Sequence, residues 1–403
     1  MKVVWPKRTL GSICEFVRGP FGGSLKKSEF VSDGFAVYEQ QHAIYNQFES
    51  IRYFITDSKF KEMQRFELCP NDLIMSCSGT MGRVAIVPNH IRKGIINQAL
   101  LKLTPSNAVL PEFLKYWMDS AVFQTSLIEQ SGGAAIQNVA SVRILKDINI
   151  FLPPLSEQQR IVAILDEAFE AIAAARANAE QSRQNAQALF ESYLQSVFSQ
   201  RGEGWVDTTI AAATGGVFTG PFGSLLHKRD YIEHGIPLVN PAHITSVGIE
   251  PDLRKTVSEE TAQRLSNYIM RAGDIVIGRR GEMGRCAIVT DIEDGWLCGT
   301  GSFVIKPSER CDARYLVRLL RSESCKTQLE NIAGGAVMPN LSNTDLSNFP
   351  IILPPIEMQR SVLRKIDLMA EKTQHLEAIY QRKIAALDEL KQSLLQQAFN
   401  GSL

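Results

Sequence analysis

The sequence predicts an α+β protein with two similar globular domains joined by two long antiparallel coiled-coil helices. Three observations lead to this prediction: sequence blocks recur in one order, a long segment without proline or glycine follows each set of blocks, and short apolar runs alternate with amphipathic stretches inside each set. A chain of 403 residues is long enough for two such domains. The repeat divides it into domain, helix region, domain and helix region, at 1–150, 151–202, 203–350 and 351–403.

The internal repeat is the main observation. "FVRGPFGGSLKKSEF" (16–30) returns as "FTGPFGSLLHKRDY" (218–231), and "DLIMSCSGTMGRVAIV" (72–87) returns as "DIVIGRRGEMGRCAIV" (274–289). "LPPLSEQQR" (152–160) returns as "LPPIEMQR" (353–360), which we align with one residue deleted after the prolines. Within a domain, "DLIMSC", "RVAIVP" and "ALLKLTP" predict short strands, and "PEFLKYWMDSAVFQTSLIEQSGG" predicts one amphipathic helix closed by glycine. Blocks in the same order indicate a pseudo-two-fold duplication.

The segments 155–199 and 357–399 predict the two long helices. Ser156 and Gln159 have the spacing of a capping box, which the second segment lacks. Apolar residues at heptad spacing predict a seam along each helix, although each helix could instead pack on its own domain. If a two-fold axis relates the halves, the second helix runs antiparallel to the first and ends beside Trp5. The first seam consists of Ile161, Leu165, Ala168, Ile172, Ala175, Ala179, Ala186, Leu189 and Tyr193.

Charge and cysteine content limit the class of protein. The formal net charge is zero, although residues 1–150 hold 17 Lys and Arg against 13 Asp and Glu. Contact with nucleic acid would therefore depend on local basic loops. The seven cysteines include no C-x-x-C pair, which favours reduced thiols over a zinc site. No apolar run is long enough for a membrane span and the first residues lack a signal-peptide core, so we expect a cytoplasmic protein.

The glycine-rich loop and the loop after the Asp-led strand are the candidate DNA contacts. Glycines let a backbone approach DNA closely, and the adjoining basic side chains can meet phosphates, although a tight turn with solvated lysines is the alternative. Where the halves differ, they can read different bases. We expect Arg279 or Arg280 to contact a base edge, because an arginine can bind guanine O6 and N7 through two hydrogen bonds. The alternatives for these two residues are a phosphate contact or pairing with Glu282. The candidates are Lys26, Lys27, Ser76, Ser78, Thr80, Arg83, His227, Lys228, Arg229, Arg279, Arg280 and Arg285.

The blocks "LPPLSEQQRIVAILDEAF" and "LPPIEMQRSVLRKIDLM", each preceded by a "GGA" block, resemble the specificity (S) subunits of type I restriction–modification systems. The resemblance covers essentially the whole chain. It implies two target-recognition domains, each reading one half of a split, asymmetric site in double-stranded DNA. It also implies a non-catalytic subunit that binds two methyltransferase subunits and, in the full complex, translocating restriction endonuclease subunits. S-adenosylmethionine, ATP and Mg are then expected on those partners, with no cofactor in this chain.

The helix starts are the expected docking surface for the methyltransferase. This expectation combines the resemblance with the repeat, because equivalent surfaces suit two copies of one partner. The candidate partner-binding residues are Leu155, Gln158, Gln159, Arg160, Ile356, Gln359 and Arg360.

Two other functions compete with DNA recognition. An adenine methyltransferase would need a [DN]-P-P-[YFW] motif to hold a flipped base, and both "NPAH" (240–243) and "LPPL" (152–155) fail it. A coiled-coil scaffold without a DNA role would not account for the duplicated basic loops. The chain also lacks a G-x-x-x-x-G-K-[ST] phosphate loop, which argues against an ATP-driven motor.

Overall fold

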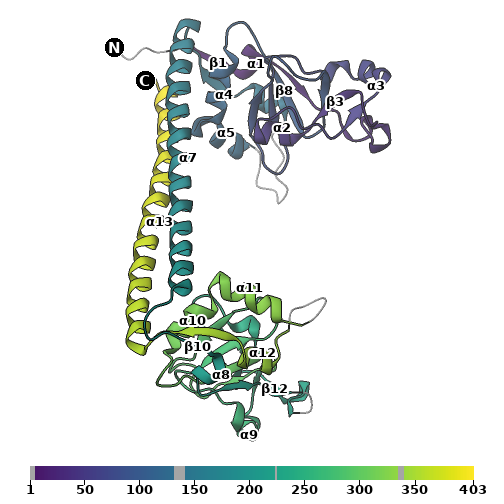
Figure 1. Cartoon of the computed structure of the whole chain (residues 1–403). Coiled ribbons are helices and arrows are strands. Elements are labelled where there is room, and N and C mark those ends of the chain that lie inside the picture. The colour runs from purple at the N-terminus through teal and green to yellow at the C-terminus, as the bar shows by residue number, and fades with distance from the viewer. Residues whose placement is uncertain (1–4, 131–140, 223–224, 335–339) are drawn as a thin grey trace. The chain divides into compact units, whose positions relative to one another are not determined.

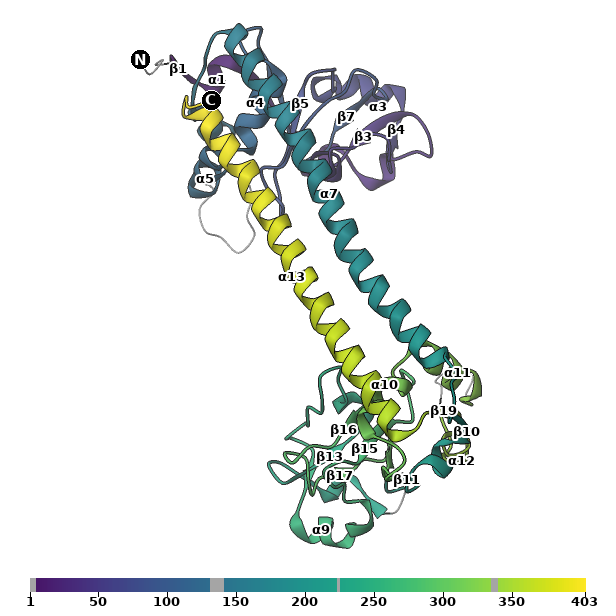
Figure 2. The ribbon, with the colours of Figure 1, turned by 60° about the vertical axis from the view of Figure 1, so that its left-hand side comes forward.

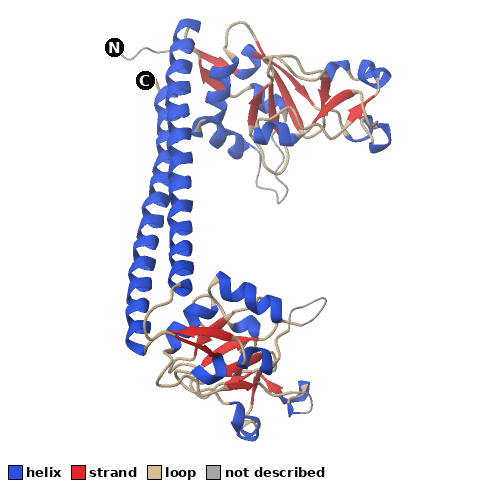
Figure 3. Cartoon of the chain, in the orientation of Figure 1, coloured by secondary structure: helices blue, strands red, loops and turns tan. Residues whose placement is uncertain are grey.

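The structure, a computed structural model, describes residues 5–130, 141–222, 225–334 and 340–403 and has two compact units. Unit 1 comprises Met1–Gln181 and Tyr380–Leu403, and unit 2 comprises Ser182–Ile379. The long helices α7 (Leu155–Ser199) and α13 (Ile356–Phe399) each belong partly to both units. Each unit therefore combines one domain of helices and strands with a part of each long helix (Figures 1 and 3).

The first domain has a four-stranded antiparallel sheet of order β2-β8-β5-β6 and a smaller sheet of order β4-β3-β7, in which β3 and β7 run parallel. A separate pair, β1 and β9, joins the two ends of the domain. The strands are β1 (Lys7–Thr9), β2 (Cys14–Arg18), β3 (Phe35–Tyr38), β4 (Phe54–Ile55), β5 (Leu73–Ser76), β6 (Val84–Ile86), β7 (Gly94–Ile96), β8 (Leu100–Pro105) and β9 (Asn149–Phe151). The helices are α1 (Leu10–Ile13), α2 (Gln40–Tyr45), α3 (Asp57–Glu62), α4 (Pro111–Asp119), α5 (Ala121–Gln130) and α6 (Val142–Lys146), with 3₁₀ turns at Gly22–Ser24, Lys27–Glu29 and Gln64–Phe66.

The second domain repeats this plan. Its main sheet has the order β11-β18-β15-β16, its second sheet has the order β12-β14-β13-β17, and β10 pairs with β19. The strands are β10 (Val206–Thr209), β11 (Val217–Thr219), β12 (Tyr231–Ile232), β13 (Ile236–Val239), β14 (Thr256–Val257), β15 (Ile275–Gly278), β16 (Cys286–Ile288), β17 (Leu297–Cys298), β18 (Ser302–Ile305) and β19 (Pro350–Leu353). The helices are α8 (Ile210–Ala213), α9 (Glu259–Arg264), α10 (Ala313–Leu320), α11 (Glu323–Ile332) and α12 (Asn343–Ser347), with 3₁₀ turns at Lys228–Asp230, Pro241–His243 and Ser266–Tyr268. The predicted duplication and mixed fold class are confirmed.

One predicted helix of the first domain is two helices. The stretch that starts "PEFLKYWMDS" breaks at Ser120, which is buried and has an extended backbone. The Ser120 hydroxyl donates to the Trp117 carbonyl at 2.6 Å, and such a side-chain bond competes with continuation of the helix. Ser322 breaks the second domain's helices at the equivalent place, where its hydroxyl accepts from the Cys325 N–H and caps α11. The serine therefore explains both breaks.

The long helices run antiparallel inside unit 1. Arg176 of α7 pairs with Asp388 of α13 at 3.2 Å, and Arg160 donates to the Leu403 carbonyl at 2.8 Å, so residue numbers rise along one helix as they fall along the other. The two helices lie side by side in both views (Figures 1 and 2). Trp5 shares a hydrophobic core with Leu395 and Phe399, as predicted from the two-fold argument.

Each domain is completed by the start of one long helix and the end of the other. Phe399 at the end of α13 packs edge-on against Phe113 of α4, with ring centroids 5.3 Å apart. Phe198 at the end of α7 packs in the same way against Tyr315 of α10, at 5.7 Å. The heptad seam is confirmed only in part: Ile161, Leu165, Ile172 and Ala179 are buried, whereas Leu189 is 63% exposed.

Both long helices begin in the same way, which corrects two predictions. The Pro154 carbonyl accepts from the N–H groups of Glu157 and Gln158, and the Pro355 carbonyl accepts from those of Met358 and Gln359. Helix α7 therefore begins at Leu155, so Ser156 lies inside the helix and the predicted capping box is wrong. The matching bonds also show that no residue is deleted after the second pair of prolines: Gln158 corresponds to Gln359.

Candidate nucleic-acid interface

The glycine-rich loop is fixed against the end of the central strand in both domains. The Gly19 N–H donates to the Leu100 carbonyl at 2.9 Å, and the Gly220 N–H donates to the Ser302 carbonyl at 3.1 Å. A Cβ at Gly19 would lie 1.9 Å from the Asn97 carbonyl oxygen, and one at Gly220 would lie 2.0 Å from that of Gly299. Only glycine fits such an approach between two backbones. The shared glycine thus sets the path of the loop that follows it.

An exposed aromatic ring follows each glycine. Phe21 is 79% exposed and Phe222 is 51% exposed, although both come from the same "GPFG" block. Large apolar side chains on a surface are informative when they recur in equivalent places. The sequence predicted a basic loop at this position but did not single out these rings.

The basic turns are built alike in the two domains. The Lys26 N–H donates to the Glu29 carboxylate at 2.6 Å, and the His227 N–H donates to the Asp230 carboxylate at 2.6 Å. These bonds are the main reason that the pKa values of both carboxyl groups fall below their usual range. The turns expose a row of side chains, and among the described residues none of them forms a salt bridge. This row consists of Lys26, Lys27, His227, Lys228 and Arg229.

The loop after β5 corrects one predicted contact. Ser76 is buried, its hydroxyl donates to the Thr80 carbonyl at 2.6 Å, and it accepts from the Arg83 N–H at 3.0 Å. A buried hydroxyl with both partners in its own loop cannot reach DNA, so Ser76 shapes the loop instead. Ser78 is half-buried, and Thr80 and Arg83 are exposed, which leaves these three available.

The corresponding loop after β15 carries two arginines that meet one amide. Arg279 and Arg280 each donate from Nε to the Asn340 side-chain oxygen, at 3.1 and 3.3 Å. Arg279 is half-buried, with its guanidinium 5.3 Å from the ring centroids of both Phe222 and Phe303. Burial, with a smaller effect of Arg280, lowers the pKa of Arg279. Neither arginine pairs with Glu282, so that alternative is wrong for these two.

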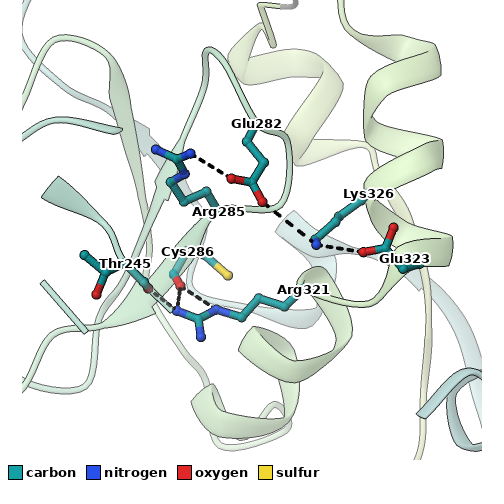
Figure 4. A network of polar contacts seen from close by, with 7 residues as sticks. All are labelled: Thr245, Glu282, Arg285, Cys286, Arg321, Glu323 and Lys326. Carbon is teal, nitrogen blue, oxygen red and sulfur yellow. Dashed lines mark hydrogen bonds and ion pairs between the residues drawn. The ribbon is translucent and has the colours of Figure 1, made fainter. Parts of the chain in front are cut away.

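Glu282 instead binds a different arginine of the same loop. Its carboxylate lies between Arg285, at 2.7 Å, and Lys326 of α11, at 3.9 Å (Figure 4). The hydrogen bond from Arg285 lowers the pKa of Glu282. Arg321 donates to the Thr245 and Cys286 carbonyls and so holds the base of the loop (Figure 4). Arg285 is therefore a partly neutralised arginine in a fixed position.

The first domain anchors its loop without charges. Gln124 of α5 donates from Nε2 to the Gly82 carbonyl at 2.9 Å and to the Met118 carbonyl at 2.7 Å. Thr80 occupies the place of Glu282, so Arg83 has no carboxylate partner among the described residues. The two domains thus hold equivalent loops by different chemistry.

Two candidate partner-binding residues are internal to the protein. Gln158 and Gln359 have no exposed surface. Gln158 accepts from the Leu110 N–H and donates to the Ala108 and Pro153 carbonyls, and Gln359 accepts from the Asp312 N–H and donates to the Arg310 and Pro354 carbonyls. Their predicted partner contacts are therefore wrong: these amides join each helix start to its domain.

The other candidate partner-binding residues remain predictions. Leu155, Gln159, Arg160 and Arg360 are exposed, and Ile356 is half-buried. Arg160 and Arg360 pair with Glu157 and Glu357 of their own helices. The starts of α7 and α13 thus keep an accessible surface beside the buried amides.

Other kinds of site are absent from the residues that the structure describes. No group of three or more His, Cys, Asp or Glu side chains there could hold a metal ion. The seven cysteines are free thiols, and six of them are buried. No described helix is both long and apolar enough for a membrane span.

Comparison with known proteins gives matches over nearly the whole chain. A family model described as "Type I restriction modification DNA specificity domain" matches residues 2–181 and 226–383. The specificity subunit of type I restriction enzyme MjaVIII from Methanocaldococcus jannaschii is 24% identical over 339 residues, which are 78% of this chain and 77% of the relative. The specificity subunit of EcoKI from Escherichia coli is 20% identical over 371 residues, covering 87% and 78%.

Two solved structures share the fold. A chain from a study of complex assembly and conformational transition of the type I R-M system has a TM-score of 0.76 at 19% identity, covering 100% of this chain and 99% of the other. The HsdS subunit of Thermoanaerobacter tengcongensis has a TM-score of 0.67 at 19% identity, covering 100% and 98%.

Proposed function

Because the chain belongs to the family of type I restriction–modification DNA specificity subunits, we propose that each of its domains reads one half of a split, asymmetric DNA site. A subunit of this family is a DNA-recognition component without catalytic activity of its own. The equivalent basic turns at Lys26 and His227 carry the proposal: the scaffold that holds them is shared, whereas the loops beside them differ. Shared turns suit the uniform phosphate backbone, and different loops suit two different half-sites.

Members of this family work with methyltransferase and restriction subunits. We propose that two methyltransferase copies bind this chain, one on the start of each long helix, because α7 and α13 begin with the same geometry. S-adenosylmethionine, ATP and Mg would then bind to the partners. Methyl transfer by the isolated chain would contradict this division of roles.

The direct test is to sequence the methylated adenines of cells that carry the chain with its methyltransferase. We expect one motif with two defined half-sites and an unread spacer between them. Deleting the gene should remove methylation from that motif alone. A continuous motif, or a motif that survives the deletion, would contradict the proposal.

The basic turns should contribute to binding of every DNA sequence. Changing Lys26 and Lys27 to Gln should weaken binding to cognate and unrelated duplexes equally, because the phosphates are the same in both. The slope of the logarithm of the binding constant against the logarithm of the salt concentration should fall in magnitude by about 2, which corresponds to two lost phosphate contacts. Fluorescence anisotropy of the complex at several salt concentrations measures both effects. Lys61→Gln in α3, where Lys61 already pairs with Asp57, is the matched control. Altered sequence preference with an unchanged slope would contradict the assignment.

The helix pair should set the spacer between the half-sites. Deleting 175–181 from α7 and 382–388 from α13 removes Arg176 together with its partner Asp388. Removing seven residues shortens each helix by about 10 Å and rotates the parts on either side of the deletion relative to each other by only about 20°. At roughly 3.4 Å per base pair, the preferred spacer should shorten by about three base pairs. Binding to duplexes with a graded series of spacers tests this. An unchanged spacer would contradict the proposed role of the helices.

A further inference from the structure

The two main sheets allow an unambiguous comparison of positions beside the glycine-rich loop. Leu101 of β8 pairs with Arg18 of β2, and Phe303 of β18 pairs with Thr219 of β11. Because Leu101 and Phe303 occupy the same place in their sheets, Arg18 corresponds to Thr219. The glycines that follow, Gly19 and Gly220, confirm this register through their matching close approaches.

The opposite side of the central strand gives a second correspondence. The Cys77 N–H donates to the Ala99 carbonyl at 2.9 Å, and the Arg279 N–H donates to the Gly301 carbonyl at 3.0 Å. Cys77 and Arg279 each directly follow the strand that pairs with β8 or β18, so they correspond as well. The first domain thus has arginine and cysteine at these two positions, and the second has threonine and arginine.

In the first domain Arg18 lies near Cys77, the position that arginine occupies in the second domain. Burial raises the pKa of the Cys77 thiol to about 11, and the positive charge of the nearby Arg18 opposes this rise. In the second domain Thr219 accepts a hydrogen bond from Asn343 at 3.1 Å, and Arg279 supplies the guanidinium. Each domain therefore places one guanidinium beside the loop that presents Phe21 or Phe222, and the two arginines approach from opposite sides of the central strand.

Neither Arg18 nor Arg279 forms a salt bridge with a residue that the structure describes, although both arginines are half-buried. Partial burial of an unpaired guanidinium is unfavourable unless a ligand completes its hydrogen bonds. In Arg279 the Nε–H is used by Asn340, which orients the side chain, and no described residue accepts a hydrogen bond from its two terminal nitrogens.

From this arrangement we infer that Arg18 is a specificity-determining residue of the first domain and reads a guanine, as Arg279 does in the second. The inference rests on the proposed function. A guanidinium matches guanine O6 and N7 with two parallel hydrogen bonds. If these arginines bound phosphates, we would expect them to come from the same position in both domains, because the DNA phosphate backbone is uniform. The arginine instead comes from a different strand in each domain, which suits half-sites that present guanine at different base-pair steps or on different DNA strands.

The test uses the complex of the full chain with its methyltransferase subunits and a set of duplexes in which each base pair of both half-sites is replaced in turn. Arg18→Ala should lower affinity for the cognate site by roughly 10- to 100-fold. It should abolish discrimination at one G·C pair of one half-site and leave the other half-site unchanged. Arg279→Ala should likewise abolish discrimination at one G·C pair, but in the other half-site only.

Two further measurements separate base reading from other roles. Arg18→Lys keeps the charge but lacks the two-pronged donor, so it should discriminate as poorly as Arg18→Ala. Its thermal unfolding midpoint should match that of the unaltered chain. Recovery of discrimination by lysine, equal losses at all DNA sequences, or full discrimination by Arg18→Ala would overturn the inference while leaving the proposed function intact. If the unaltered complex showed no preference for a split site, the proposed function itself would fail.

Discussion

Substituting Gly19 by alanine should destabilise the protein by about 3 kcal/mol and abolish recognition of one half-site. The added Cβ would lie 1.9 Å from the Asn97 carbonyl oxygen, and the backbones of both Gly19 and Asn97 are fixed by hydrogen bonds. No side-chain rotation can relieve such a clash, so β2 has to move away from the strand end. Thermal unfolding and binding of the complex to duplexes with one altered half-site measure the two effects.

Gly23→Ala is the matched control for this substitution. Gly23 lies four residues further along the same loop, and a Cβ there would meet nothing within 4 Å. Its free energy of unfolding should change by no more than about 0.5 kcal/mol, as for an ordinary surface substitution. Gly220→Ala should reproduce the Gly19 result in the second domain. A Gly19→Ala protein as stable as the Gly23→Ala protein would show that the close approach is not rigid.

Gln158→Ala should cost about 3 kcal/mol of stability, although the residue lies at the start of an otherwise exposed helix turn. The change removes the fully buried Gln158 side chain and leaves the Leu110 N–H and the Ala108 and Pro153 carbonyls without their partner. Each unsatisfied buried group costs about 1–3 kcal/mol, and water has little access to replace the lost bonds. Gln158→Glu should not rescue stability, because a carboxylate cannot donate and its burial is unfavourable.

The neighbouring Gln159 provides the control, because it is exposed on the next position of the same helix. Gln159→Ala should leave the unfolding midpoint almost unchanged. Denaturant titration of both variants, together with Gln359→Ala in the second domain, gives the comparison. The buried role would be disproved if Gln158→Ala were fully stable but no longer bound its methyltransferase.

The sequence predicted much of the fold because duplicated blocks reveal themselves by comparison. The apolar runs that became β5, β6 and β8 were recognisable, since each is bounded by residues that end strands. The two-residue strand β4 and the parallel pairing of β3 with β7 were not predicted, because so short a strand has no measurable periodicity. Ser120 was read as part of a helix, since its burial and hydroxyl bond depend on tertiary contacts.

The candidate site was harder to predict than the fold. Ser76 and Gln158 are polar residues in apparently exposed segments, and only the three-dimensional structure shows that their partners are backbone groups of the protein itself. The sequence did not mark Arg18 as a candidate, because it directly precedes the shared "GPFG" block and differs between the halves. Extending that alignment backwards by one position would have set Arg18 against Thr219.

Because the core of unit 1 includes Leu395 and Phe399, that unit cannot finish folding until these residues have been synthesised. Its first part ends at Gln181 and its second begins at Tyr380, so the ribosome adds roughly 200 residues in between. At translation rates of about 5–20 residues per second, the first part of unit 1 waits on the order of 10–40 s for the second part. During that interval the unpaired apolar surface of the nascent chain is exposed to aggregation.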